Sequence, residues 1–386
     1  MRIAVNAAIV DAALSGLGVY TANLVRELAR LHPDLVVYTS APEACGVDAA
    51  RVRRIRRTLQ PHRGARGHFQ RIVWAQLGLP VRLLADRASV LLSPVPEGTL
   101  LAPVPQVIVV HDLIPLHLPG SFPRQYLYFR HVVPRILRSS RAIVTDSEST
   151  RRDVVSFYGV DASRVSVVPC GYDRARFRVG LDASAVKDKH GLERYVLFVG
   201  NLFPHKNLPV LFEAFALLAR RFPHALVIAG RKDARYYPSL AAQARALGAA
   251  DRVRFLDYVP SEDLPALYAG ADALVLPSLY EGFGLPVLEA MACGTPVIAS
   301  RAGSLPEATG DGAVLVESSD VRALAAAMEA VLSDPGERER LRHRGFAQVA
   351  RFGWERTALE MLEVLRAAVG GGSRVPLAGG RESRAR

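Results

Sequence analysis

Cysteine and long apolar runs are scarce in this chain of 386 residues. The three cysteines, Cys45, Cys170 and Cys293, lie far apart and show no metal-binding spacing, which fits a reducing cytosol. No apolar stretch is long enough to cross a bilayer. The opening residues, 1–5, are typical of a first strand and not of a signal peptide. We therefore expect a cytoplasmic protein.

Lysine is absent from the first half of the chain, where arginine is abundant. Residues 1–186 contain 24 arginines, no lysine and 14 acidic residues, a net charge of +10, whereas residues 187–386 contain 25 basic and 23 acidic residues, a net charge of +2. The arginines gather within 51–71 and 124–141. Such patches attract nucleic acid, anionic lipid or a phosphorylated acceptor. An ordinary solvated surface is the alternative.

What the chain does contain is a regular alternation of short apolar runs and amphipathic segments. Half of its residues are apolar, so two sizeable cores are expected at this length. The alternation is typical of parallel sheets covered by helices. We predict an α/β protein with two doubly wound, Rossmann-like domains that face a central cleft. The predicted strands are residues 3–5, 35–39, 107–110, 142–145, 165–168, 196–199, 226–229, 253–256, 273–276 and 297–299.

The same pattern divides the chain into five parts. A first domain is expected over residues 1–175 and a second over 190–353. The intervening residues 176–189 have little pattern and are expected to form a linker. Residues 354–369 have the spacing of one more amphipathic helix, and the Gly- and Arg-rich residues 370–386 are expected to be disordered.

Two glutamates after the apolar run 273–276 form the most informative pair in the chain. Glu281 is expected on a glycine-containing loop at the carboxyl end of a strand, and Glu289 about one turn into the following helix. A helix N-terminus in this position is a ready anion site. A carboxylate on either side suits a nucleotide diphosphate sugar. The backbone groups expected to face this ligand belong to Phe283, Gly284 and Leu285.

Other strand ends in the predicted second domain carry basic residues. Lys206 follows the strand 196–199 in the segment that contains Asn201, and it would supply a compact positive charge to a diphosphate. Arg231 follows the strand 226–229 and could reach a phosphate or a base. No DxD-type metal motif follows a predicted strand, so we expect catalysis without a metal and without another cofactor.

The predicted first domain has two candidate segments of its own. Gly16 and Gly18 follow the first strand and would let the backbone approach a ligand closely, although a plain structural turn also explains them. His111 and Asp112 directly follow the strand 107–110. His111 would contact a sugar hydroxyl or stabilise developing charge, or it is a buried histidine bonded to a neighbour.

In this order along the chain, these segments resemble the retaining GT-B glycosyltransferases of glycosyltransferase family 4. The most specific element is the pair Glu281 and Glu289 within Pro-Ser-Leu-Tyr-Glu-Gly-Phe-Gly-Leu-Pro. The resemblance extends over most of the chain and implies that the helix 354–369 crosses back to the first domain. The supporting elements are the Gly16/Gly18 loop, His111-Asp112, residues 146–149, residues 168–173, Lys206 with its flanking residues, residues 301–307 and the final helix from Trp354.

The resemblance also implies roles for the candidate residues. Glu281 would contact the donor hexose, Glu289 the ribose hydroxyls, and Lys206 the departing diphosphate. His111 would contact the sugar. Asn201 stands where the family often has an arginine, and Arg231 is expected to compensate. The remaining donor contacts would be Gly16, Gly18, Phe283, Gly284 and Leu285.

The same resemblance implies a partner and a location. The first domain would hold the acceptor and the second the nucleotide sugar, with GDP-mannose favoured and mannose or rhamnose as the transferred sugar. We expect a glycan or lipid-diphosphate acceptor at the inner face of the cytoplasmic membrane. The arginines of residues 51–71, with Phe69 and Trp74, would contact the anionic membrane surface.

Two other functions stay open from the sequence. A sugar-nucleotide epimerase or a phosphorylase of similar architecture would need further acid/base groups or an extra cofactor. A basic, non-catalytic nucleic-acid-binding protein would explain the sequence pI near 10.0. No recognised nucleic-acid motif is present, so no nucleic-acid partner is expected.

Overall fold

The computed structural model describes residues 1–11 and 15–370, and these divide into two compact units. Unit 1 comprises residues 1–170 together with the C-terminal helix from Trp354, and unit 2 comprises residues 171–353. Residues 176–189, expected as a linker, belong to unit 2 and include most of a helix. The predicted disordered tail lies, beyond residue 370, outside the described residues.

Unit 1 is built on a parallel sheet of seven strands in the order β3-β2-β1-β4-β5-β6-β7. The first strand lies between the second and the fourth, with Ile3 opposite both Leu35 and Val90. The strands are β1 (Ile3–Asn6), β2 (Leu35–Thr39), β3 (Val52–Arg54), β4 (Val90–Ser93), β5 (Gln106–Val110), β6 (Ala142–Thr145) and β7 (Val165–Val167). The helices are α1 (Gly16–Leu31), α2 (Pro42–Cys45), α3 (Gly64–Val73), α4 (Leu79–Ala85), α5 (Ile114–His117), α6 (Pro123–His131), α7 (Val133–Ser139), α8 (Glu148–Tyr158) and α17 (Trp354–Val369).

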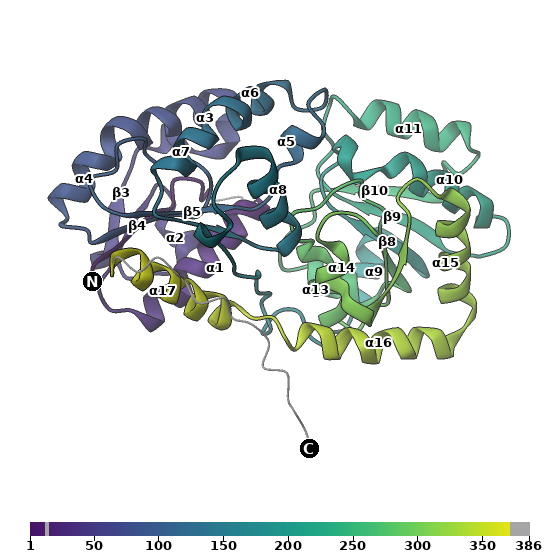
Figure 1. Cartoon of the computed structure of the whole chain (residues 1–386). Helices are drawn as coiled ribbons and strands as arrows, with labels where there is room; N and C mark the ends of the chain where they lie inside the picture. The colour runs from purple at the N-terminus through teal and green to yellow at the C-terminus, as the bar shows by residue number, and fades with distance from the viewer. Residues whose placement is uncertain (12–14, 371–386) are drawn as a thin grey trace, which may run out of the picture. The chain divides into compact units, whose positions relative to one another are not determined.

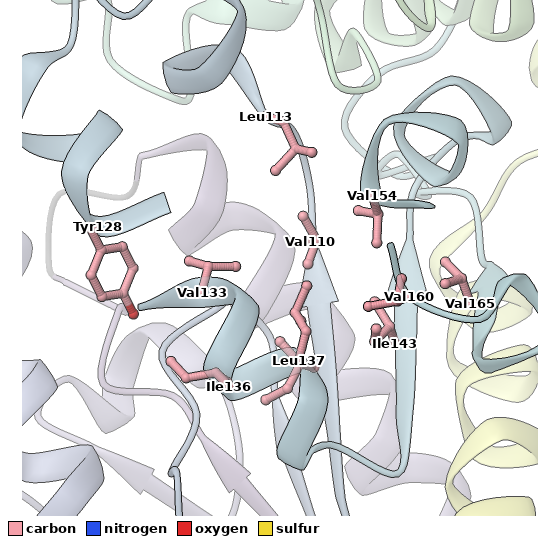
Figure 2. Close-up of a cluster of buried hydrophobic side chains, with 11 residues drawn as sticks. Val110, Leu113, Tyr128, Val133, Ile136, Leu137, Ile143, Val154, Val160 and Val165 are labelled. Carbon is pink, nitrogen blue, oxygen red and sulfur yellow. The ribbon is translucent and has the colours of Figure 1, made fainter. Parts of the chain in front are cut away.

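Helices cover both faces of this sheet, as Figure 1 shows, with α1 and α17 on one face and α3, α4 and α7 on the other. The strands are short apolar runs buried on both sides, which is the pattern of a parallel sheet. In Figure 2, side chains from β5, β6 and α7 meet, among them Val110, Ile143 and Leu137. Burial of such side chains is the main stabilising contribution to unit 1.

The last helix, α17, belongs to unit 1 although it follows the whole of unit 2 in the chain. The Thr357 hydroxyl donates to the Pro169 carbonyl oxygen over 2.7 Å. The Trp354 ring meets the Tyr20 ring edge-on, with the ring centroids 5.5 Å apart. The helix therefore completes the core of the first unit, as the sequence predicted.

Unit 2 contains a parallel sheet of six strands in the order β10-β9-β8-β11-β12-β13. The strands are β8 (Tyr195–Val199), β9 (Ala225–Ala229), β10 (Val253–Asp257), β11 (Ala273–Leu276), β12 (Val297–Ser300) and β13 (Ala313–Val316). The helices are α9 (Ser184–His190), α10 (Leu208–Leu218), α11 (Tyr237–Ala246), α12 (Leu264–Ala269), α13 (Leu285–Ala292), α14 (Leu305–Thr309), α15 (Val321–Ser333) and α16 (Pro335–Val349). Two Rossmann-like parallel sheets confirm the predicted fold class.

Within residues 1–11 and 15–370, no helix combines the length and the apolar character needed to cross a bilayer.

Candidate functional site

In both sheets the strand order reverses beside the first strand, because β1 lies between β2 and β4 and β8 lies between β9 and β11. Ligands of doubly wound folds bind outside the carboxyl ends of the strands at this switch point. In unit 2 the segments in question are the loop after β8, which carries Lys206, and the loop after β11, which carries Glu281.

These two loops of unit 2 are held together by hydrogen bonds. The backbone N–H of Leu279 donates to the His205 carbonyl oxygen over 2.7 Å. The side-chain amide of Asn207 donates to the carbonyl oxygens of Pro277 and Ser318, over 3.1 and 2.7 Å. Asn207 itself has a φ of 56°, which asparagine tolerates better than most residues. The ends of β8 and β11 are thus joined into one surface.

A buried ion pair spans the two loops. Lys206 Nζ lies 2.6 Å from Glu281 Oε1, and both residues are buried. The Ser278 hydroxyl donates to the same oxygen over 2.6 Å. Burial raises the pKa of the Glu281 carboxyl, but the Lys206 ammonium and the Ser278 hydroxyl outweigh it and hold the pKa below its ordinary value. Glu281 is therefore ionised at neutral pH.

Backbone contacts fix the position of Glu281. Its carbonyl oxygen accepts from the backbone N–H and the hydroxyl of Ser304, over 3.1 and 3.0 Å. A Cβ on Gly303 would lie 2.4 Å from the same oxygen, and Gly303 has a φ of 56°, so only glycine fits here. The carboxylate of Glu281 is consequently held by its backbone as well as by Lys206.

The start of α13 offers donors next to Glu281. Gly284 has a φ of 96° and precedes the first helical residue, Leu285. Among the described residues, no hydrogen bond from the backbone N–H groups of Phe283, Gly284 or Leu285 is present. The Phe283 ring packs against Phe352, with centroids 5.7 Å apart. Free N–H groups at a helix N-terminus attract anions.

Glu289 is partly buried one turn further along α13 and bonds to a different partner. The Tyr268 hydroxyl donates to Glu289 Oε2 over 2.8 Å. Burial raises the pKa of Glu289 to about 7, although the Tyr268 hydrogen bond lowers it. Glu281 and Glu289 therefore differ near neutral pH, since the first is ionised whereas the second gains and loses its proton in this range.

The histidine next to Lys206 is neutral. Burial, followed by the charge of Lys206, lowers the pKa of His205 to about 4, even though Glu281 opposes the shift. The positive charge of this loop hence resides on Lys206.

The other predicted residues of unit 2 are exposed. Asn201 lies on the surface, and its side chain accepts from the Phe203 backbone N–H over 3.4 Å. Arg231 is exposed, with its guanidinium 5.7 Å from the centre of the Tyr258 ring. Within the described part of the chain, no hydrogen bond or ion pair joins either residue to Lys206 or Glu281.

In unit 1, the predicted glycines lie at the start of α1. The Ser15 hydroxyl accepts from the Gly18 backbone N–H over 3.4 Å and so caps the helix. No atom lies within 4 Å of a Cβ built on Gly16. Packing against the described residues therefore does not require a glycine at position 16.

Both ring nitrogens of His111 are engaged within unit 1. Its Nε2 lies 2.7 Å from the Pro94 carbonyl oxygen, which can only accept, and its Nδ1 lies 2.5 Å from Asp146 Oδ2. Burial lowers the pKa of His111, but Asp146 and the Pro94 carbonyl raise it above its ordinary value. Any ring-nitrogen contact from His111 to a ligand requires one of these bonds to open.

Of the residues expected at the membrane surface, Arg71 is buried, so that part of the prediction is wrong, and Trp74 is partly buried. Arg71 is buried and binds Glu97 with two hydrogen bonds of 2.7 and 3.0 Å. Trp74 packs against Tyr38, with ring centroids 6.2 Å apart. A buried guanidinium requires a carboxylate partner, and Glu97 is too distant in sequence to be recognised as one.

Several residues that shape the site were not predicted from the sequence. Ser278 lies three positions before Glu281 and gave no signal of its own, and Tyr268 reaches Glu289 from another helix. Asp146 belongs to the segment 146–149 that supports the family resemblance, but its bond to His111 was not predicted, although it directly follows β6 as His111 directly follows β5.

Known proteins resemble this chain over most of its length. Residues 182–348 match the family described as glycosyl transferases group 1, and residues 14–176 match the one described as glycosyltransferase family 4. O-antigen chain mannosyltransferase B of Escherichia coli is 33% identical over 268 residues, which cover 67% of this chain and 70% of that protein. D-inositol 3-phosphate glycosyltransferase of Segniliparus rotundus is 34% identical over 251 residues, which cover 63% of this chain and 56% of that protein.

A solved structure shares the fold. Alr3699/HepE of Anabaena, in complex with UDP and glucose, superimposes with a TM-score of 0.74 at 19% identity, over 95% of this chain and 100% of that one.

Proposed function

The chain belongs to the group 1 glycosyltransferases of glycosyltransferase family 4, and from this premise we propose that it transfers a hexose from a nucleotide diphosphate sugar to a glycan or lipid-linked acceptor, with retention of anomeric configuration. One observation supports this most directly. The buried pair Lys206–Glu281, 2.6 Å apart, joins the loops after β8 and β11 at the switch point of unit 2. It combines a cation for a diphosphate with a carboxylate for sugar hydroxyls.

We assign the donor contacts of unit 2 accordingly. Lys206 and the free N–H groups of Phe283, Gly284 and Leu285 would bind the diphosphate. Glu281 would accept hydrogen bonds from the hexose, and Glu289 from the ribose hydroxyls. Arg231 and Asn201 remain proposed phosphate or base contacts. In unit 1, His111, Gly16 and Gly18 remain proposed ligand contacts.

The proposed chemistry needs no enzymic nucleophile. The bond between the anomeric carbon and the phosphate oxygen breaks, and the acceptor oxygen bonds to the same face of that carbon. The acceptor proton passes to the leaving diphosphate. The charge that develops on the diphosphate is the main demand on the site, and Lys206 with the α13 amides supplies fixed positive ends for it. We therefore propose that no metal is required.

Mannose is the sugar we favour. The O-antigen mannosyltransferase of E. coli supports a mannose donor such as GDP-mannose, and O-antigen chains support a glycan acceptor. The inositol phosphate glycosyltransferase and the UDP complex of HepE support UDP sugars and phosphorylated acceptors as the next candidates. We propose that the protein works at the inner face of the cytoplasmic membrane.

We do not favour an epimerase or a nucleic-acid-binding protein, because both family matches and the two relatives named above are glycosyltransferases.

A donor screen tests the proposal. Purified protein is incubated with GDP-mannose, UDP-glucose and a nucleotide-linked rhamnose, with and without EDTA, and the released nucleotide is measured. We expect one donor to be turned over without a metal. Lys206→Ala and Glu281→Ala should each reduce turnover at least about a hundredfold, the scale of losing one preorganised charge contact.

Lys189→Ala is the matched control, because this lysine forms only an exposed ion pair with Asp263. It should retain normal turnover. Near-normal rates in both site variants would refute the assigned roles, and no nucleotide release from any sugar donor would refute the function.

A further inference from the structure

A helical segment of unit 1 exposes a stripe of large apolar side chains. Helix α3, a π-helical turn (Trp74–Gly78) and helix α4 follow one another without a break over residues 64–85. Successive members of the stripe lie three or four residues apart, so they share one side of the helix. They are 40–70% exposed: Phe69, Val73, Leu77, Val81 and Leu84.

The opposite side of the same segment is fixed to unit 1. Leu79 and Leu83 are fully buried in the core cluster with Tyr38 and Leu91. Arg71 is tied to Glu97 by two hydrogen bonds. Since turning the helix would expose these residues, the apolar stripe stays at the surface.

The segment of sequence that carries the stripe contains basic residues and no acidic ones. Residues 49–85 contain nine arginines and no aspartate or glutamate. Arg63, Arg66 and Arg82 of this segment are exposed. An apolar stripe flanked by exposed arginines is typical of helices that lie in a lipid interface.

Helix α6 lies beside α3. The Tyr128 ring of α6 meets the His68 ring of α3, with centroids 4.9 Å apart, and Figure 1 shows the two helices near each other. Residues 113–145, which contain α6, also have no acidic residue but five arginines. Leu127 of α6 is exposed. The basic apolar face is the name we give to the exposed stripe of α3 and α4 together with Arg63, Arg66, Arg82 and Leu127.

We propose that the basic apolar face docks unit 1 onto an anionic lipid bilayer, with the apolar stripe at the boundary between headgroups and acyl chains and the arginines at the headgroup phosphates. Charge complementarity selects this occupant. A second copy of the chain would bring like charges together, because residues 1–186 carry a net charge of +10. Nucleic-acid binding depends mainly on contacts to phosphates, so it would not account for a stripe of five exposed apolar side chains. The inference extends the proposed function by naming the surface on which a lipid-linked acceptor is met.

Vesicle binding tests this surface. The full chain is sedimented with vesicles of phosphatidylglycerol and phosphatidylcholine, or of phosphatidylcholine alone, at low and high salt. We expect binding only to the anionic vesicles, and weaker binding at high salt because the arginines are then screened. The double variant Leu77→Glu/Leu84→Glu should bind at least about tenfold more weakly, because it removes apolar area and adds repulsion.

The matched control is Leu217→Glu in α10 of unit 2, where the leucine is 57% exposed. It should bind like the unchanged protein. Thermal unfolding confirms that the variants are folded. No binding to anionic vesicles, or equal weakening by the control, overturns the proposal. A dimer in size-exclusion chromatography that the double variant converts to a monomer overturns it too, because the face is then an interface between copies.

Donor hydrolysis is measured on the same samples to separate this proposal from the proposed function. The double variant should hydrolyse donor normally, since Leu77 and Leu84 lie outside the donor site. A protein that docks but releases no nucleotide refutes the enzyme assignment alone. A protein that releases nucleotide but does not dock refutes the docking surface alone.

Discussion

Lys206 and Glu281 compensate each other's charge inside unit 2. Neither side chain reaches much solvent, and the two charged atoms are 2.6 Å apart. Removing one partner of a buried pair leaves an uncompensated charge and typically costs about 3–5 kcal/mol. A loss of activity in Lys206→Ala must consequently be measured on protein shown to be folded. The arrangement also means that a bound diphosphate competes with Glu281 for the same ammonium.

Glu289 should make the stability of the protein depend on pH. Burial raises its pKa to about 7 against an ordinary 4.5, so the folded chain holds this proton more tightly than the unfolded chain does. The stabilising contribution is therefore complete below about pH 4.5 and is lost as the pH rises through about 7. We expect the free energy of unfolding to fall by roughly 1–3 kcal/mol between pH 5 and pH 8, because Glu289 loses its proton over this range. Urea unfolding at both pH values measures this difference.

Glu289→Gln provides the comparison for that experiment. The amide cannot ionise, so the difference in unfolding free energy between pH 5 and pH 8 should shrink by the contribution of this residue. An unchanged difference would mean that Glu289 titrates near its ordinary value in the folded protein. Glu329→Gln is a suitable control, because Glu329 forms an exposed pair with Arg221 and its loss should change the free energy of unfolding by less than about 1 kcal/mol.

Single residues show what a sequence can reveal about this site. Lys206 and Glu281 were both found because each follows a recognisable apolar run. Their pairing was not, since β8 and β11 are neighbours in the sheet but separated by two other strands in the chain. The contacts of His111 also depend on partners from other strand ends, namely Pro94 and Asp146. Site residues can be recognised from the local sequence pattern. The hydrogen bonds and ion pairs between them depend on the order of the strands in the sheet, which the local pattern does not reveal.

At the scale of elements, the loops after β8 and β9 touch through their backbones. A Cβ on Gly230 would lie 1.7 Å from the Gly200 carbonyl oxygen. No rotamer change relieves an overlap with backbone, so the loop that leads to Lys206 must move. We expect Gly230→Ala to destabilise unit 2 by about 1–3 kcal/mol, the usual range for overpacking, and to weaken donor binding. Thermal unfolding and the donor KM measure the two effects.

Gly120→Ala is the control for that change. Nothing lies within 4 Å of its added methyl group, and its φ is not in the left-handed region. It should leave both the melting temperature and the KM unchanged. If Gly230→Ala behaves the same way, the contact between the two loops is looser than the backbone positions imply.

Sequence analysis missed three strands, β3, β4 and β13. Their length is not the reason, because β11 also has four residues and was predicted. Strands β3 and β13 lie at the edges of their sheets and are only partly buried, and β3 contains two arginines, so it shows no apolar run. The strands with a clear apolar run, such as β5 and β11, were predicted to within one residue of their bounds.

At the scale of the whole molecule, the two units have separate cores and the proposed nucleotide site belongs to unit 2 alone. A ligand that binds only the folded state raises the melting temperature. The chain has two tryptophans, Trp74 and Trp354, and both lie in unit 1. Tryptophan fluorescence therefore follows unit 1, while calorimetry follows both units.

We expect a nucleoside diphosphate at about a hundred times its Kd to raise the calorimetric transition of unit 2 by roughly 5–10 °C. The tryptophan fluorescence transition should stay where it is. Lys206→Ala should abolish the calorimetric shift. If both signals move together, the units unfold as one cooperative body and the separation of cores does not extend to their stability.

The buried cysteines have a practical consequence for all such experiments. Cys45, Cys170 and Cys293 are at most 7% exposed, and burial raises the pKa of each thiol. Thiolates are the reactive form, so maleimide dyes should ignore the natural cysteines while the protein is folded. A single cysteine introduced on the surface can then carry a fluorophore at a chosen position without any prior removal of native thiols.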